Sequence, residues 1–244
     1  MIGLAAAAAP PLVGAGTHVG KVRHENEDAL VVAPAGGLWG VADGMGGHAR
    51  GAWASRTVCQ GLEALRPSGR IAHDIETIAD ALADANDLIV AEGARGGSTI
   101  GTTVVALVTG EGRYACLWAG DSRIYLIRDG AIRQLTRDHS QVEELVTAGV
   151  LSREAARDHP LGNVVTRAVG VAPGLAIDCV EDALRPGDRF LLCSDGLTKV
   201  MEDEEIARTL APLPPAAGCD ALIATVLDRG APDNVTVIVV DVPA

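Results

Sequence analysis

The sequence predicts an α+β fold, a layered sandwich in which helices cover antiparallel sheets. Strand-like and helical segments come in blocks, without the regular alternation typical of a parallel βαβ fold. The last such segment, from Val235 to Val240, is apolar on both faces, which suits a strand buried inside a sandwich.

Runs rich in apolar and β-branched residues, bounded by turn-forming residues, predict the strands. They are 28–33, 38–42, 102–109, 114–119, 123–128, 131–135, 189–193 and 235–240. Apolar residues at helical spacing predict the helices. They cover 58–65, 75–89, 142–146, 202–210 and 219–229. We find no internal repeat and no long linker, so we expect a single catalytic domain over residues 1–244, with an irregular surface segment at about 140–163.

The chain has 244 residues and a formal net charge of −12. This charge argues against a nucleic acid or an anionic membrane as a partner. The apolar start, residues 1–16, has no basic residue ahead of it and is interrupted by Pro10-Pro11, so we do not interpret it as a signal peptide. The five cysteines include no CxxC pair, and we expect buried, reduced thiols. We therefore predict a cytoplasmic protein.

Four aspartates fall where predicted strands meet loops: Asp43, Asp121, Asp195 and Asp233. A single Asp-Gly pair is most often only a turn. If the four converge, however, two carboxylates ~4 Å apart repel by about 4 kcal/mol at an effective dielectric constant of ~20. Such a cluster must hold protons or bind cations, and oxygen ligands suit Mg²⁺ and Mn²⁺. Gly44, next to Asp43, would let its backbone carbonyl approach an ion closely.

A second polar cluster lies near the start of the chain, at residues 23–28. In an extended strand, Arg23, Glu25 and Glu27 point to the same side. Arg23 could form a bidentate pair with a phosphate. The alternative is an ordinary surface salt bridge.

Together these segments resemble the metal-dependent Ser/Thr protein phosphatase family, the PPM or type 2C class, in its bacterial form. The resemblance rests on an ordered set of short motifs between about residues 14 and 241. They are Gly20-Lys21-Val22-Arg23, Asn26-Glu27-Asp28, Val41-Ala42-Asp43-Gly44-Met45-Gly46-Gly47-His48, Gly101-Thr102-Thr103, Ala119-Gly120-Asp121-Ser122-Arg123, Leu135-Thr136, Asp138-His139-Ser140, Thr166-Arg167-Ala168-Val169-Gly170, Cys193-Ser194-Asp195-Gly196-Leu197 and Asp233-Asn234-Val235-Thr236. It implies an α-β-β-α sandwich, two antiparallel sheets flanked by helices, with a metal site at one edge.

The resemblance also implies roles for the matching residues. Asp43 would bridge two ions, the Gly44 carbonyl and Glu27 would serve the second ion, and Asp195 and Asp233 would bind the first. Arg23 would bind the substrate phosphate, so that Asp43 and Arg23 are the residues to which we assign catalysis. Asp121, with Asp195, would bind a third, weaker ion, while Asp28 and Asn234 would support the ligands from behind.

The implied activity is hydrolysis of phosphoserine and phosphothreonine in proteins by metal-activated water at a binuclear Mn²⁺ or Mg²⁺ centre. The expected partners are phosphorylated proteins, substrates of a bacterial Ser/Thr kinase in signal transduction, with no nucleic acid and no membrane, and we expect a monomer. The segment 140–163 matches a variable flap of the family, which would influence substrate choice; the alternative is an ordinary surface loop.

One position departs from the animal members of the family, which carry a histidine after the bridging Asp-Gly as the proposed general acid. Met45 stands there in this chain, and His48 is the nearest histidine. Two other functions remain open. One is a catalytically silent pseudophosphatase that binds phosphoproteins, and the other is a different two-metal phosphoesterase such as a nuclease.

Overall fold

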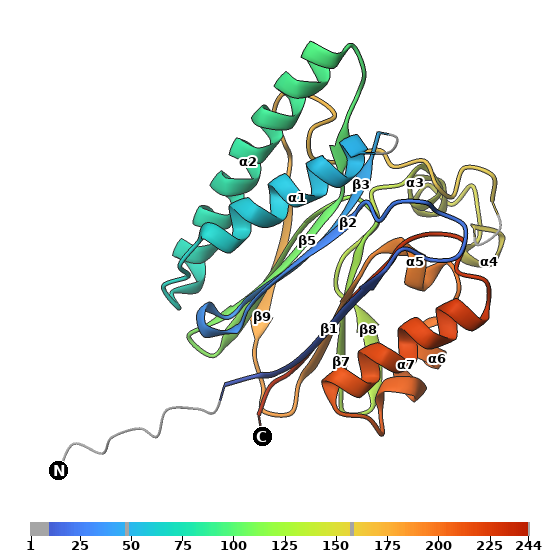
Figure 1. The fold of residues 1–244 in the computed structure, drawn as a ribbon. Helices are drawn as coiled ribbons and strands as arrows, with labels where there is room; N and C mark the ends of the chain where they lie inside the picture. The colour runs from blue at the N-terminus through green and yellow to red at the C-terminus, as the bar shows by residue number, and fades with distance from the viewer. Residues whose placement is uncertain (1–9, 47–48, 157–158, 244) are drawn as a thin grey trace.

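A computed structural model describes residues 10–46, 49–156 and 159–243. Two β-sheets lie face to face, and helices cover both outer faces (Figure 1). The strands are β1 (Leu12–His18), β2 (Asp28–Ala33), β3 (Leu38–Met45), β4 (Gly101–Thr102), β5 (Val104–Gly110), β6 (Arg113–Ala119), β7 (Arg123–Arg128), β8 (Ala131–Gln134), β9 (Asp178–Ala183), β10 (Arg189–Cys193) and β11 (Val235–Asp241). The helices are η1 (Pro34–Gly36, a 3₁₀ turn), α1 (Ala49–Ala64), α2 (Ile71–Gly96), α3 (Gln141–Thr147), α4 (Arg153–Ala156), α5 (Asp195–Thr198), α6 (Asp203–Leu210) and α7 (Pro215–Asp228).

One sheet has the strand order β1-β11-β10-β7-β8, and the other has the order β2-β3-β5-β6-β9, with β4 paired to β3. Neighbouring strands are antiparallel in both sheets. In Figure 1, α1 and α2 lie on the outer face of the second sheet, and α6 and α7 on that of the first. The predicted α-β-β-α sandwich of two antiparallel sheets is confirmed.

The apolar core forms layers, and β11 shows how alternation along a strand divides side chains between them. Val237 and Val239 pack beneath the helices α5, α6 and α7. Ile238 and Val240 point the other way and pack between the two sheets, with Phe190 from β10. Each fully buried side chain of this kind contributes roughly 1.5–3 kcal/mol through removal of its apolar area from water. The prediction that this strand is apolar on both faces because it is buried on both faces is confirmed.

Two strands were not predicted. Strand β1 lies in the Ala- and Gly-rich start of the chain and pairs with β11 along its full length. Strand β9 is an edge strand that contains the acidic residues Asp178, Glu181 and Asp182, so it lacks an apolar run. The predicted strand 102–109 is divided into β4 and β5 at Thr103, because the Thr103 N–H donates to the Asp43 carbonyl at 2.8 Å.

The prediction that the cysteines are buried and reduced holds for four of them. Cys59, Cys116, Cys193 and Cys219 are buried free thiols. It is wrong for Cys179, which is a free thiol exposed on β9. The reason is that β9 is the last strand of its sheet, so one side of it has no neighbouring strand.

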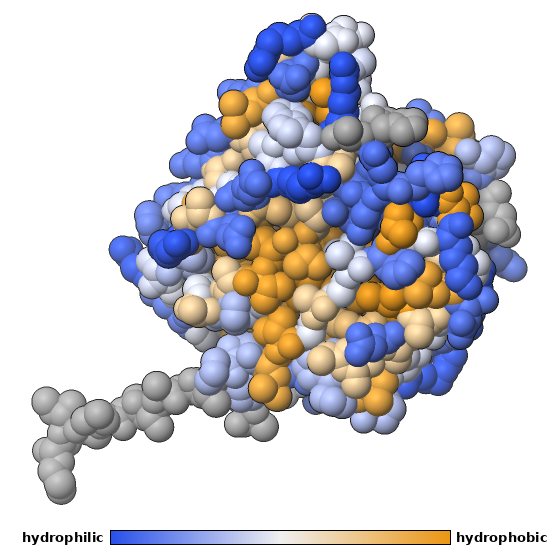
Figure 2. Space-filling view, in the orientation of Figure 1, coloured by the Kyte–Doolittle hydropathy of each residue, from blue (hydrophilic) through white to orange (hydrophobic). Residues whose placement is uncertain are grey.

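Two observations concern the helices and the surface of the protein. No helix in the described part of the chain is long and apolar enough to cross a lipid bilayer. Figure 2 shows an apolar area in the middle of the face where the edge strands β1 and β2 run. Leu12 of β1 and Val32 of β2 are exposed apolar residues.

Candidate metal and phosphate site

The predicted site residues converge on one cavity of about 790 Å³. Its lining comes from strand ends of both sheets, the loop between β1 and β2, the turn before β11, and Asn163 and Val165, which follow α4 in the chain. Among its lining residues are Arg23, Glu27, Asp43, Gly44, Asp121, Asp195, Asp233 and Asn234. Of the residues assigned a role from the sequence, Asp28 is the one that does not line it.

Asp43 is held by the strands on both sides of β3. It lies opposite Asp28 of β2, and its N–H donates to the Thr103 hydroxyl at 3.1 Å. Gly44 follows it where the backbone of β3 is closely packed, because a Cβ at this position would lie 2.2 Å from the carbonyl oxygen of Gly51. Glycine is therefore required at residue 44 for α1 to approach β3 this closely.

Asp195 and Asp233 come from the other sheet. Asp195 is the first residue of α5, two residues after the end of β10, and Asp233 lies two residues before the start of β11. The two segments touch at Gly196, where a Cβ would lie 1.8 Å from the Asn234 carbonyl oxygen. This contact brings residues that are far apart in sequence to one wall of the cavity.

Asp28 lies behind the cavity wall and joins the two sheets. Its Oδ2 accepts hydrogen bonds from Ser194 Oγ at 2.8 Å and from Thr236 Oγ1 at 2.7 Å. Its Oδ1 is buried and has no hydrogen-bond partner. Burial raises the pKa of Asp28 to about 7, against the effect of the two hydroxyl donors.

Asn234 fastens the segment that carries Arg23 and Glu27. Its side-chain amide donates to the carbonyls of Val19 and Glu25 at 2.9 and 3.0 Å, and its Oδ1 accepts from the Glu27 N–H at 2.9 Å. The side chain is therefore fully used in positioning backbone next to the cavity.

The carboxylates are electrostatically frustrated. Burial raises the pKa of Asp43 well above its ordinary value, and repulsion from Asp28, Asp195, Asp121 and Asp233 adds to the effect. Burial, followed by repulsion from Asp195, raises the pKa of Asp121 to about 7. The arrangement therefore favours any cation that can enter it.

Two basic side chains supply part of the positive charge that the carboxylates favour. Lys199 Nζ lies 2.5 Å from Asp195 Oδ2 and 3.2 Å from Asp233 Oδ2. Arg23 Nε lies 2.9 Å from Asp233 Oδ1, with 57% of the Arg23 side chain exposed. Burial opposes ionisation of Asp233, but Lys199 and Arg23 outweigh it and lower its pKa. Arg23 thus forms the salt bridge that was the alternative interpretation, and does so with a carboxylate of the cavity.

Lys199 was missed in the sequence. It is four residues after Asp195, a spacing that brings an acidic and a basic side chain together on a helical turn. That spacing was the available signal, although it could not reveal the second contact with Asp233.

The donor set fits hard divalent ions, because it consists of carboxylate and carbonyl oxygens. Asp195 Oδ1 is buried without a hydrogen-bond partner, as expected of an oxygen placed to bind a cation. Within the described ranges, however, no three His, Cys, Asp or Glu side chains are grouped closely enough to hold one ion as they stand.

Asn163, the last residue of the segment 140–163, lines the cavity. Val165, two residues further along the chain, also lines it. The segment contains α3, whose first turn is capped by Ser140 Oγ accepting from the Glu143 N–H at 3.3 Å. Met45 lines the cavity, whereas His48 lies outside the described residues.

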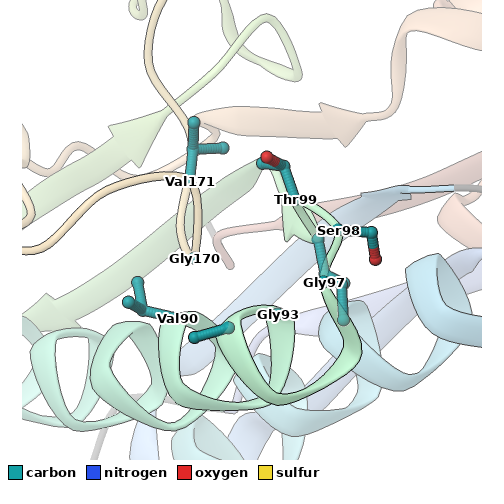
Figure 3. Close-up of a pocket in the computed structure, with 9 residues that line it drawn as sticks. Val90, Gly93, Gly97, Ser98, Thr99, Gly170 and Val171 are labelled. Atoms are coloured by element: carbon teal, nitrogen blue, oxygen red, sulfur yellow. The ribbon is translucent and has the colours of Figure 1, made fainter.

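A second hollow, of about 280 Å³, lies between the end of α2 and the loop at Gly170–Val171. Figure 3 shows Val90 and Gly93 of α2 on one side of it and Val171 on another. Its lining contains no ionisable side chain, so it offers no charge for binding a phosphate or an ion.

Comparison with known proteins agrees with this geometry. The family model for protein phosphatase 2C matches residues 15–228. The chain is 38% identical over 231 residues to the serine/threonine protein phosphatase PstP of Mycobacterium tuberculosis, covering 91% of this chain and 43% of that protein. The chain therefore spans less than half the length of this relative.

Solved structures show the same fold. PppA, described as a key regulatory component of T6SS in Pseudomonas aeruginosa, superimposes with a TM-score of 0.88 at 40% identity, over 96% of this chain and 98% of that one. The catalytic domain of the serine/threonine protein phosphatase PstP in complex with 2 manganese ions gives a TM-score of 0.87 at 34% identity, over 97% of this chain and 100% of that one. The family match, these relatives and the acidic cavity lead to one conclusion: the chain belongs to the protein phosphatase 2C family of serine/threonine protein phosphatases, which are hydrolases.

Proposed function

We propose that this chain hydrolyses phosphoserine and phosphothreonine in proteins and works with two Mn²⁺ or Mg²⁺ ions. One observation carries the proposal: Asp43 from one sheet lines the same cavity as Asp195 and Asp233 from the other, with Arg23 beside them. The manganese-bound structure of a relative supports the choice of ion. The cavity reaches the surface, as a site for a phosphorylated side chain on another protein must.

Asp43, the Gly44 carbonyl and Glu27 would hold one ion, and Asp43, Asp195 and Asp233 the other. When bound, such ions supply positive charge for the phosphoryl oxygens and a water nucleophile activated near neutral pH. The prediction of a third, weaker ion at Asp121 and Asp195 fits the raised pKa of Asp121.

Other residues of the chain would bind the substrate and position the metal ligands. Arg23 is partly exposed and bound to Asp233, so its guanidinium can turn to a phosphate without a large desolvation cost. Asp28 and Asn234 hold the segments that carry the ligands. Asn163, at the end of segment 140–163, lines the cavity, which supports a role for this segment as a flap that would contact the protein substrate.

The substrates would be phosphoproteins, as the serine/threonine protein phosphatase name of the relative suggests. We also propose that a bacterial Ser/Thr kinase phosphorylates them. We further propose that residues 1–244 act as one catalytic domain, as a cytoplasmic monomer, in keeping with the acidic composition of the chain.

Substitution Asp43→Asn tests the proposal. It keeps the shape of the side chain and the backbone bonds of β3, but removes the charge expected to bridge the ions. We expect hydrolysis of a phosphothreonine peptide with Mn²⁺ to fall by more than about a hundredfold, since even residues behind metal ligands are commonly worth 10–100-fold. The melting temperature should not fall.

The matched control is Asp84→Asn, which removes one carboxylate from the exposed face of α2 and should leave turnover unchanged. Full activity of Asp43→Asn after rigorous removal of metals would overturn the proposal. Tight binding of the phosphopeptide without turnover in the unmodified protein would indicate a pseudophosphatase. Cleavage of single-stranded DNA in its place would indicate a nuclease.

A further inference from the structure

Lys199 occupies a position that no assigned role explains. The chain contains two lysines, Lys21 and Lys199, among 20 basic Lys and Arg residues. Lys199 lies inside the cavity, on the turn that follows α5, where its N–H donates to the Asp195 carbonyl at 2.8 Å. The backbone therefore holds the side chain close to the carboxylates.

The ammonium of Lys199 joins two carboxylates from separate segments, one on the first residue of α5 and one in the turn before β11. Its Nζ lies 2.5 Å from Asp195 Oδ2 and 3.2 Å from Asp233 Oδ2. These are the residues to which the proposed function assigns one divalent ion. The ammonium takes up acceptor sites on these oxygens, and its positive charge repels a divalent ion placed beside them.

A charged ammonium cannot ligate a metal, because it has donors and no lone pair. It can only compete with a divalent ion for the same oxygens, or repel the ion from nearby. Asp195 Oδ1, by contrast, is buried and has no hydrogen-bond partner, so one oxygen of this carboxylate remains open while Lys199 holds the other.

We propose that Lys199 is a tethered cation of the carboxylate cluster. It offsets part of the negative charge of Asp195 and Asp233 in the metal-free protein and competes with divalent ions for these carboxylates, which lowers the metal affinity of the enzyme. This inference rests on the proposed metal-dependent function. It assigns Lys199 a regulatory effect on metal loading, not a direct part in the reaction.

Substitution Lys199→Gln should reveal this competition. We expect the dissociation constant for Mn²⁺, measured by the electron paramagnetic resonance signal of free Mn²⁺, to fall about tenfold, which corresponds to ~1.4 kcal/mol. The melting temperature in EDTA should fall, since Asp195 loses its paired ammonium and Asp233 keeps only Arg23, and the rise on adding Mn²⁺ should be larger than in the unmodified protein. Lys199→Arg, which keeps the charge, should bind Mn²⁺ nearly as the unmodified protein does.

Lys21→Gln is the matched control, since it removes the same charge from an exposed lysine that does not line the cavity. If Lys199→Gln binds Mn²⁺ no more tightly than Lys21→Gln, the inference is wrong, and this holds even if the variant is folded and active. If the unmodified protein binds no Mn²⁺ at all, the proposed function fails as well, so the two failures can be told apart.

Discussion

Asn234 offers a direct test of how the fold holds the site, because its side chain makes three hydrogen bonds to backbone groups of residues 19–27. The residue is 6% exposed, so water cannot easily replace these bonds. Substitution Asn234→Ala leaves two carbonyls and one N–H without this partner. At a net cost of ~1 kcal/mol for each bond, we expect the free energy of unfolding to fall by about 3 kcal/mol.

Urea denaturation of the metal-free protein measures this loss. For a chain of this size the melting temperature should fall by roughly 6–12 °C, at 2–4 °C per kcal/mol. Amide hydrogen exchange provides a local measurement, since the Glu27 N–H donates to Asn234 Oδ1 and should lose protection in the variant.

The substitution Asn234→Asp distinguishes the contribution of the acceptor bond from that of the two donor bonds. It keeps the acceptor for the Glu27 N–H but loses both donors and turns a carboxylate toward the carbonyls of Val19 and Glu25. We therefore expect it to destabilise the protein while retaining more protection at Glu27 than Asn234→Ala. A loss below about 0.5 kcal/mol in Asn234→Ala, which is the usual range for surface substitutions, would refute the reasoning.

Two further predictions concern stability away from the metal ligands. Arg128 forms a bidentate pair with Asp188, whose side chain is 1% exposed, so Arg128→Met should lower the free energy of unfolding by roughly 3 kcal/mol in urea denaturation. Arg95→Met, which removes an exposed pair, should change it by less than about 0.5 kcal/mol, and equal losses in the two variants would contradict the argument. Burial lowers the pKa of His139 from its ordinary 6.5, although Asp178 opposes this effect. Because the unfolded chain then binds the proton more readily, the free energy of unfolding should decrease as pH falls below about 6.5. If a His139→Gln variant shows the same dependence of unfolding free energy on pH as the unmodified protein, another group is responsible.

The sequence by itself predicted most strands and helices, because the apolar alternation of buried strands and the helical spacing of amphipathic helices are local patterns. It also placed Asp121, Asp195 and Asp233 where strands meet loops, whereas Asp43 lies within β3, which continues to Met45. Strand β1 escaped prediction because Ala and Gly give no clear alternation, and its strand character depends on pairing with β11. The exposure of Cys179 depended on β9 lying at a sheet edge, which is a property of the strand order.

Only the tertiary structure decided that these aspartates share a cavity. Asp43 belongs to one sheet and Asp195 and Asp233 to the other, and no sequence spacing states how two sheets are placed face to face. The same packing buries Asp28 between the sheets and sets Lys199 between two carboxylates. Local sequence determines where most strands begin and end. Long-range burial of the apolar faces determines which of these segments lie next to one another, and the chemistry of the site depends on this arrangement.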